Sequence, residues 1–481
     1  MSLSVRKRAI FGAGGITFAT KEAAFSTFVL LYYTQVLGLS GTVTGLMLTI
    51  GVAWDAISDP MVGMYSDRFS SRWGRRLPIM AVSVILMPLG LIGLFSPPDF
   101  VAANSTYLAI WLLGTSIWLR TAMTLFSIPQ LAMVPEITQD YHDRSQLLNV
   151  RAGLMYLTGG FLPAISLYFL FSETDGVEGL FVAENYAHFG LMSALIVVVF
   201  SVITIRGIWG FIDKDKLQTT GAPHSSGMRG LIGDFFSTFH SANFRNLLCY
   251  DMSAAAAYGA IYAFNVIAYT YYWEVDSDTL GTVFGVGVLI GVPAGMYAQK
   301  FIGRLWPKHQ VIRYTLIAAM INTVWLFPLR ELDVLPENGH WLVVSLLALQ
   351  FGGLKCFLMM RVVSTFSLAA DLTDELELRT GTRQEGGIYS VLLFNAKLAH
   401  SIGPLYGGFA LDLIGLDSSV SVDAVPPEVL TGLVWAIVLG SVPLFMLSWL
   451  FTFRFSMTQE QLKEIHRNLK AREHYSCAGQ E

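Results

Sequence analysis

Two aspartates and a serine lie within one helical turn of each other inside an apolar stretch, "WDAISDPMVG", residues 54–63. Asp55, Ser58 and Asp59 have the i, i+3, i+4 spacing that places side chains on one face of a helix. A carboxylate at the centre of a membrane helix costs roughly 2.5–3.5 kcal/mol, and two adjacent carboxylates repel unless something positive joins them. Carboxylate and hydroxyl oxygens are ligands of hard cations such as Na⁺. This face therefore predicts a cation site, and a structural ion pair is the alternative.

A third charge in an apolar stretch is Arg120, which lies four residues before Thr124 and seven before Ser127. This spacing puts all three on one helical face, and an arginine inside a span is a functional hypothesis by default. Three interpretations are open. Arg120 binds an anionic substrate group such as a uronate, sulfonate or phosphate, or it pairs with Asp55 or Asp59 in place of a cation, or it extends to the lipid headgroups.

The composition indicates which elements carry these residues. The chain has 481 residues, of which 53% are hydrophobic and only 14% charged, against about 25% charged in soluble domains. A membrane span needs about 20 mostly apolar residues. We therefore predict an all-α membrane protein with twelve transmembrane helices and no sizeable soluble domain, with spans at 9–37, 41–66, 77–97, 106–134, 147–171, 186–210, 244–272, 279–303, 309–329, 340–370, 385–415 and 427–453.

The distribution of basic residues predicts the topology. They collect in the terminal segments and the even-numbered connections, whereas the odd-numbered connections contain Arg330 alone. The positive-inside rule then places both termini in the cytoplasm. A polar break divides six spans from six, as in transporters built from two related halves. The predicted parts are an N-terminal half (1–210), a cytoplasmic middle loop with a short helix (211–243), a C-terminal half (244–455) and a cytoplasmic tail (456–481).

Four motifs in order resemble a known family. They are "LLYYTQVLGLS" (30–40), "WDAISDPMVGMYSDRFSSRWGRRLP" (54–78), "IPQLAMVPEITQDYHDRSQL" (128–147) and "ADLTDELELRTGTRQEGGIYSVLLFNAKLAHSIG" (370–403). Over essentially the whole chain the sequence resembles the glycoside, pentoside, hexuronide:cation symporter family of the major facilitator superfamily. The resemblance implies the major facilitator fold and cation-coupled symport of a sugar, glycoside or uronide-like solute by alternating access. Lysolipid transporters share several of these motifs, so an amphiphile is an alternative substrate.

The resemblance also implies a set of site residues. Asp55 and Asp59 match the family's paired aspartates, and Ser58 stands where its melibiose carriers have an asparagine. Arg151 and Lys397 match basic residues of the fifth and eleventh helices, which neutralise the polar centre and help to gate it. The implied cation-binding residues are Asp55, Ser58, Asp59 and Thr124.

The sugar site departs from the family's pattern. Two aspartates that bind galactosyl hydroxyls in the melibiose carriers correspond to Ala19 and Ser127 here, which argues against the same substrate. Glu22, one turn from Ala19, either restores an acceptor or pairs with Lys21. Lys355 and Arg361 either add to an anion-friendly cavity or act as anchors near a helix end. The predicted substrate-binding residues are Glu22, Arg120, Ser127, Arg151 and Lys397.

Two charged cytoplasmic segments are predicted gates. One is the turn at 63–78, of a kind that joins the two halves in one state of the cycle in the major facilitator superfamily. The other follows the tenth span. Charges that only determine topology, and a solvated loop, are the respective alternatives. The predicted gate residues are Asp67, Arg68, Arg72, Arg75, Asp371, Asp374 and Arg379.

The sequence does not favour an enzyme, because its histidines form no metal-spaced pair and it contains no nucleophile elbow or Walker loop. We expect no cofactor apart from a coupling Na⁺ or H⁺, and no metal beyond a possible Na⁺ at Asp55 and Asp59. The expected partners are a small-molecule substrate, the coupling cation and the lipid bilayer, with no nucleic acid. We expect a monomer in the cytoplasmic (inner) membrane of a bacterium. Two alternatives are an uncoupled carrier in which Arg120 replaces the cation, and a membrane sensor without transport activity.

Overall fold

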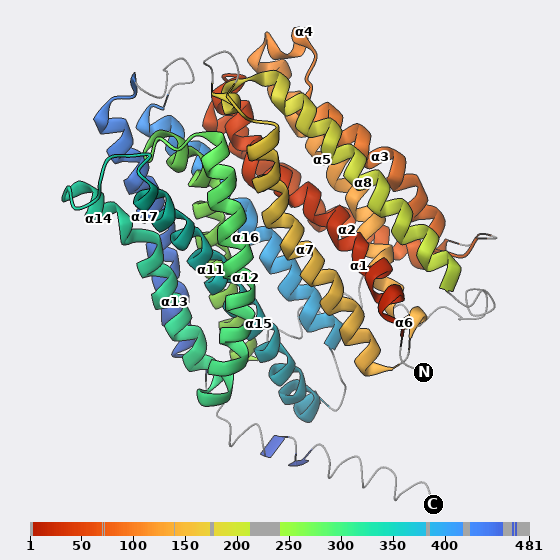
Figure 1. The fold of residues 1–481 in the computed structure, drawn as a ribbon. Coiled ribbons are helices and arrows are strands. Elements are labelled where there is room, and N and C mark those ends of the chain that lie inside the picture. The colour runs from red at the N-terminus through yellow and green to blue at the C-terminus, as the bar shows by residue number, and fades with distance from the viewer. Residues whose placement is uncertain are drawn as a thin grey trace, which may run out of the picture.

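The protein is a bundle of long helices (Figure 1). The computed structural model describes residues 3–69, 71, 73–138, 140–173, 178–211, 241–380, 385–416, 424–455, 464–465 and 467–468. Within these ranges the regular structure is entirely helical, which confirms the predicted all-α class. The predicted middle loop and tail lie almost wholly outside the described residues.

The first half contains the helices up to residue 211. They are α1 (Val5–Ala23), η1 (Ala24–Val29), η2 (Tyr32–Val36), α2 (Gly41–Arg68), α3 (Leu77–Phe95), α4 (Asp99–Ala102), α5 (Ser105–Ala132), α6 (Val134–Ile137), α7 (Tyr141–Phe169), η3 (Gly179–Phe181) and α8 (Ala183–Phe211). Polar side chains begin several of them by accepting backbone N–H groups that have no intrahelical partner. Asn104 does so for α5 and Asp140 for α7.

The second half begins at residue 242. It contains α11 (Ala242–Tyr271), α12 (Ser277–Leu305), α13 (Lys308–Val324), α14 (Leu326–Glu331), α15 (Trp341–Thr380), α16 (Glu385–Ile414) and α17 (Pro427–Thr452). Ser241 caps α11 through its hydroxyl, which accepts from the backbone N–H of Phe244. Most contacts are made within each half, and the halves meet mainly where α2 packs on α16 and α7 packs on α12.

Ten of the described helices are long and apolar enough to cross a membrane. The other two predicted spans, 9–37 and 385–415, coincide with α1 continued by η1 and η2, and with α16. The first of these is wound as a π-helix over Ala24–Val29 and Tyr32–Val36, and π segments are frequent at functional sites. A count of twelve crossings, with both termini in the cytoplasm, stays a prediction.

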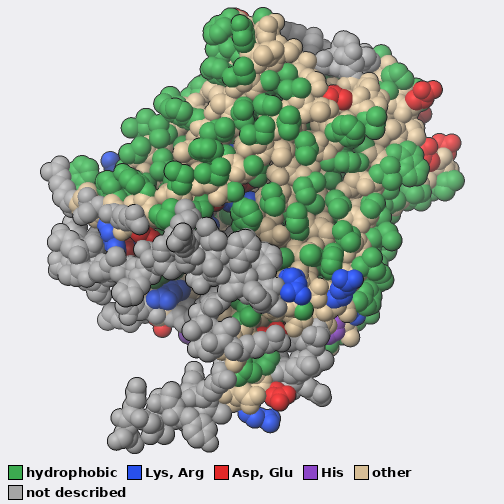
Figure 2. All heavy atoms as spheres, turned by 180° about the vertical axis from the view of Figure 1, so that it is seen from behind, with side chains coloured by type: hydrophobic (Ala, Val, Ile, Leu, Met, Phe, Trp, Pro, Cys, Tyr) green, Lys and Arg blue, Asp and Glu red, His purple; other side chains and the backbone are tan. Residues whose placement is uncertain are grey.

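The two ends of the bundle differ in charge. The N-terminus and α6 lie at one end, called here the inner end, and α4 lies at the opposite, outer end (Figure 1). Hydrophobic side chains cover most of the face in Figure 2, whereas most of the Lys and Arg side chains on that face lie in its lower half, toward the inner end. This arrangement agrees with an apolar band in lipid and a basic inner rim.

The two halves approach most closely where glycines remove the side chain. A Cβ atom on Gly408 of α16 would overlap the carbonyl oxygen of Gly41 in α2. In the other crossing, a Cβ atom on Gly281 of α12 would lie 2.7 Å from the carbonyl oxygen of Ala164 in α7. Both crossings lie toward the outer end, because Gly41 begins α2 and Gly281 is in the first two turns of α12.

Candidate functional site

The predicted aspartate face of α2 meets an arginine of α5. Nη1 of Arg120 lies 3.0 Å from Oδ2 of Asp55, and both side chains are buried. The guanidinium also lies over the ring of Phe25 in η1, 4.6 Å from its centroid. Of the three interpretations of Arg120, the geometry matches the ion pair, since a buried guanidinium does not reach the headgroups. Such a charge-assisted hydrogen bond is about twice as strong as a neutral one.

Asp59, one turn further along α2, is joined to both halves. Its Oδ1 accepts a hydrogen bond from the hydroxyl of Thr124 on α5, at 2.9 Å. Its Oδ2 forms a short ion pair with Nζ of Lys397, which comes from α16 in the second half. The same Nζ lies 4.0 Å from Oδ2 of Asp55. The structure therefore brings the two aspartates, Thr124 and the predicted basic residue of α16 into one cluster.

Two buried oxygens of this cluster have no hydrogen-bond partner in the described structure. They are Oδ1 of Asp55 and Oγ of Ser58. Together with the oxygens of Asp59 and Thr124 they form a set of hard donors of the kind that Na⁺ prefers. The residues therefore fit the implied cation. However, Arg120 and Lys397 already neutralise the two carboxylates, so an added cation has to displace one of these bases.

Of the predicted substrate-binding residues, Arg120 and Lys397 belong to this cluster, and the other three are in the first half. Nε of Arg151 on α7 donates to Oε1 of Gln130 at 3.1 Å, and Nε2 of Gln130 donates to the backbone carbonyl of Phe11 at 2.8 Å. Gln130 thus joins α1, α5 and α7. The sequence analysis did not single it out, although it lies within the third family motif. Ser127 is buried on α5.

Glu22 has taken the alternative role considered for it. The carboxylate forms an ion pair with the adjacent Lys21 and is half exposed, whereas Lys21 is buried. The ammonium of Lys21 also lies 5.0 Å from the centroid of the Phe18 ring.

A second buried ion pair lies in the other half. Nη1 of Arg361 on α15 is 2.6 Å from Oδ1 of Asp251 on α11, and the amide of Asn395 donates to the second oxygen of Asp251 at 3.1 Å. The sequence analysis noted Arg361 but not its pairing with Asp251. Lys355, six residues before Arg361, donates to the hydroxyl of Tyr262 at 3.2 Å and lies 4.7 Å from the centroid of the Phe351 ring. No carboxylate of the described chain forms an ion pair with Lys355.

The predicted gate residues pair within their own halves. Asp67 forms an ion pair with Arg76 at 2.8 Å, and Arg75 lies 3.4 Å from Glu136 of α6. In the second half Asp371 pairs with Lys308 at 2.7 Å, and Asp374 lies on the same inner part of α15. Residue 72 and the side chains at 68 and 379 lie outside the described residues. Each of the three ion pairs named here joins residues of one half.

The outer end, by contrast, is joined across the halves. The hydroxyl of Tyr271 on α11 donates to Oε1 of Gln35 in η2 at 3.1 Å, and its ring meets that of Phe181 edge to face. The carboxylates of Asp412 and Glu178 accept hydrogen bonds from the opposite half nearby. These hydrogen bonds join the halves at the outer end, and the ion pair of Asp59 and Lys397 joins them at the centre.

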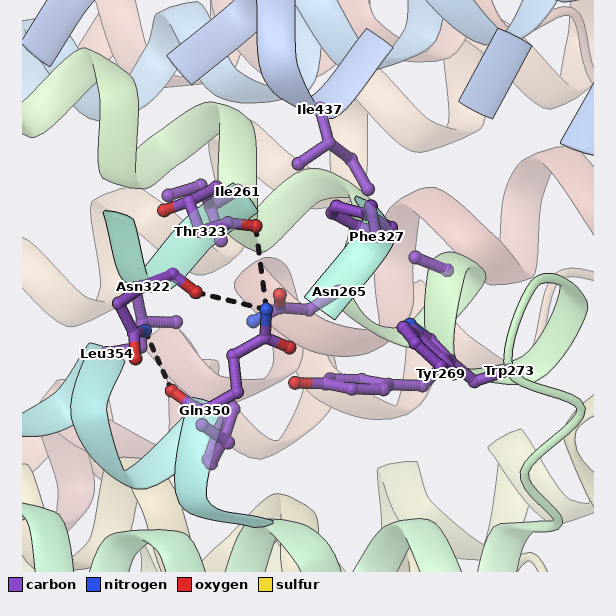
Figure 3. A pocket seen from close by; sticks show the side chains of 12 residues that line it. Ile261, Asn265, Tyr269, Trp273, Asn322, Thr323, Phe327, Gln350, Leu354 and Ile437 are labelled. Carbon is purple, nitrogen blue, oxygen red and sulfur yellow. Dashed lines mark hydrogen bonds between the residues drawn. The ribbon is translucent and has the colours of Figure 1, made fainter. Parts of the chain in front are cut away.

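A small polar pocket lies apart from the charged cluster, within the second half (Figure 3). The amides of Asn322 and Gln350 each donate to a backbone carbonyl of the other's helix, at 2.9 and 3.0 Å. The hydroxyl of Tyr269 points toward the side chain of Gln350. The pocket contains none of the predicted site residues, and its polar groups join α13 to α15.

A bundle of lipid-facing helices with paired charges at its centre defines a multi-pass integral membrane transporter. The chain belongs to the MFS/sugar transport protein family, whose model matches residues 10–459, so the predicted family is confirmed. It is 24% identical over 479 residues to the uncharacterised symporter YnaJ of Bacillus subtilis (strain 168), covering 98% of this chain and 96% of that protein. It is 22% identical to the glucuronide carrier protein homologue of Escherichia coli (strain K12), covering 96% and 95%.

A solved structure shows the same fold. A bacterial homologue of the human lysosomal transporter Spinster, in an inward-facing and unoccupied conformation, aligns with a TM-score of 0.61 at 13% identity. The alignment covers 94% of this chain and 98% of that one. The family and the two sequence relatives are transporters, which confirms that the chain is a secondary transporter and not an enzyme.

Proposed function

We propose that the protein is a cation-coupled symporter for an anionic glycoside and that Asp59 is its coupling carboxylate. The observation that carries the proposal is the ion pair between Asp59 and Lys397, because its two members belong to different halves. When the halves rock in an alternating-access cycle, Lys397 withdraws from Asp59. A monovalent cation then compensates the partly buried carboxylate of Asp59, since leaving it unpaired inside the bundle is costly.

Asp55 has a different role in this proposal. Its partner Arg120 lies on α5 of the same half, so rocking of the halves leaves that ion pair intact. Asp55 contributes its free Oδ1 to the cation, together with Oγ of Ser58 and the oxygens of Asp59 and Thr124. Coupling through a single exchangeable carboxylate predicts one cation per cycle.

The expected charge of the substrate follows from the numbers of basic and acidic side chains at the centre of the bundle. The central charges comprise six bases and four acids, an excess of two positive charges: Lys21, Arg120, Arg151, Lys355, Arg361 and Lys397 against Glu22, Asp55, Asp59 and Asp251. Arg151 and Lys355 are the two bases without a carboxylate partner in the described structure. An anionic group on the sugar supplies the missing charge. The relative named as a glucuronide carrier protein homologue supports this class.

The proposal includes the cellular location and the oligomeric state of the protein. We place the carrier in the cytoplasmic (inner) membrane of a bacterium, on the evidence of its bacterial relatives, with the basic inner end facing the cytoplasm. A monomer suffices, because a single chain supplies every residue of the proposed cation site.

Uptake into proteoliposomes tests this function. Methyl β-D-glucuronide is expected to accumulate when an inward Na⁺ or H⁺ gradient is imposed, whereas methyl β-D-glucoside enters at least about tenfold more slowly. Asp59→Asn is expected to abolish the stimulation by the gradient. The matched control is Asp99→Asn at the exposed start of α4. Gradient-driven accumulation that survives in Asp59→Asn would refute the coupling role.

A second candidate is an uncoupled carrier, which is favoured by the fact that each aspartate already has a basic partner. In that case Lys397 stays with Asp59 throughout the cycle. Uptake of the glucuronide would then equilibrate without accumulating and would be insensitive to either gradient in the unmodified protein.

A further inference from the structure

In each half, backbone N–H groups at the start of the second long helix donate hydrogen bonds to a carboxylate of the opposite half. Asp412, in the last turn of α16, reaches the start of α2. Its Oδ1 accepts from the backbone N–H of Gly41 at 2.7 Å, and its Oδ2 accepts from the backbone N–H of Thr42 at 2.8 Å and the hydroxyl of Ser40 at 2.7 Å.

The same contact recurs in the other direction. Glu178 lies just before η3 in the first half and reaches the start of α12 in the second. Its Oε1 accepts from the backbone N–H of Ser277 at 2.7 Å and also forms a short hydrogen bond with the hydroxyl of Ser277. Asp276, the residue in the N-cap position of α12, makes no side-chain cap bond of its own. Glu178 therefore takes the place of the local cap.

These contacts are suited to hold the outer ends together. The first N–H groups of a helix have no intrahelical partner, and the helix dipole adds a partial positive charge there. A carboxylate accepts hydrogen bonds from these N–H groups and also brings a negative charge to the positive end of the dipole. Each carboxylate stands beside one of the two glycine crossings, Gly41 with Gly408 and Gly281 with Ala164. Separating the outer ends breaks both sets of hydrogen bonds at once, whereas separating the inner ends breaks neither.

We propose that Asp412 and Glu178 form a two-point outer latch that sets the balance between the outward-closed and outward-open forms of the carrier. The proposal rests on the alternating-access cycle described above but not on the substrate or the coupling ion. The two points are related by the equivalence of the halves, since α2 and α12 are the second long helices of their halves. Releasing one point weakens the latch, and releasing both opens it.

Distances between spin labels on the purified full-length protein test the latch without any transported solute. The native cysteines Cys249, Cys356 and Cys477 are changed to serine, and labels are attached at Phe100→Cys and Val334→Cys. These two exposed positions lie at the outer ends of opposite halves. The parent is expected to give one predominant short distance. Asp412→Ala or Glu178→Ala should raise the ratio of the long to the short population by about tenfold or more, as expected for loss of two or three hydrogen bonds, and the double variant should exceed both.

Matched controls remove other carboxylates from the outer surface. Asp99→Ala at the start of α4 and Asp278→Ala in the exposed first turn of α12 should leave the distances of the parent unchanged. If a latch variant does not remain monodisperse, Ser277→Ala removes only the hydroxyl donor to Glu178 and should shift the populations in the same direction by a smaller factor. Identical distance distributions in the parent and the double variant, or an equal shift in the controls, would overturn the latch. Absence of glycoside uptake in the parent would overturn the proposed function alone.

Discussion

Arg120 affects the chemistry of the centre because it pairs with one oxygen of Asp55 and leaves the other without a hydrogen-bond partner. A buried pair loses about 3–5 kcal/mol when one partner is removed, since the other is left as an uncompensated charge. The pair at 3.0 Å, with 8% and 5% of the two side chains exposed, meets that condition.

We therefore predict that Arg120→Met lowers the melting temperature of the purified protein, and that Arg120→Met combined with Asp55→Asn recovers a large part of the loss. Fluorescence-monitored thermal unfolding in detergent measures both. Arg304→Met removes an exposed arginine at the end of α12 and serves as the control. Equal melting temperatures for the parent and the single Arg120 variant would contradict a stabilising pair.

At this scale the sequence predicted which residues lie together on one helix but not which partner each one chooses. The i, i+3, i+4 spacing places Asp55, Ser58 and Asp59 on one face, and the spacing of Arg120 and Thr124 turns both toward that face. Whether the guanidinium or a cation occupies the face depends on packing between α2 and α5. The pair of Asp251 and Arg361 joins residues 110 positions apart, which no local pattern encodes.

Glu178 is a titratable group of the outer surface whose environment favours the neutral form. Burial raises the pKa of Glu178 above its ordinary value, the hydrogen bonds from Ser277 oppose this, and the nearby Asp276 and Glu173 raise it further. Opening of the latch is expected to expose this carboxyl group and to return its pKa toward the ordinary value. The closed form therefore binds the proton more tightly.

We therefore predict that lowering the outside pH increases the outward-closed population. The increase should occur between the raised pKa of Glu178 in the closed form and the lower, ordinary pKa of glutamate in the open form. The spin-label distances, recorded between pH 7.5 and pH 5, measure this change. Glu178→Gln keeps an acceptor for the N–H of Ser277 without a titrating group, so this variant should lose the pH dependence while staying closed. A pH response of unchanged size in Glu178→Gln would assign it to another group.

Among the helices, the crossing of α2 with α16 depends on Gly408 having no side chain. An added methyl group has no space against the carbonyl oxygen of Gly41, and overpacking of this kind costs about 1–3 kcal/mol. We predict that Gly408→Ala lowers the melting temperature and slows uptake. Gly114→Ala on α5 is the control, because nothing lies within 4 Å of its added Cβ atom and alanine favours a helix by up to about 1 kcal/mol. A neutral Gly408→Ala would show that the crossing is loosely packed.

The helices themselves were largely predictable, since long apolar runs between polar breaks define them. The glycine crossings between the halves were not predictable from the sequence, because a single glycine in a membrane span does not indicate which helix packs against it. Glu178 and Asp412 were missed for a related reason: an acidic residue near the outer end of a span looks like an ordinary solvated charge until the opposite half is seen to supply its N–H partners.

For the molecule as a whole, the packing of the two halves predicts that they can associate without a covalent link. The chain that joins α8 to α11 runs through residues 212–240, and the described contacts between the halves are made by the helices on either side. We predict that 1–225 and 226–481, expressed together as separate chains, copurify through a tag on either one and retain uptake. Recovery of one fragment without the other would contradict a self-sufficient interface.

The neutral pairs at the centre also determine which electrical force acts on the carrier. With Asp55 joined to Arg120 and Asp59 joined to Lys397, the two aspartates and their two partners carry no net charge before the cation enters. A cation entering with a singly anionic glycoside is likewise electroneutral, whereas with a neutral glycoside it transfers one charge and gains about 2.3 kcal/mol per 100 mV. Uptake of the anion then proceeds without a current, and the membrane voltage drives only the neutral analogue.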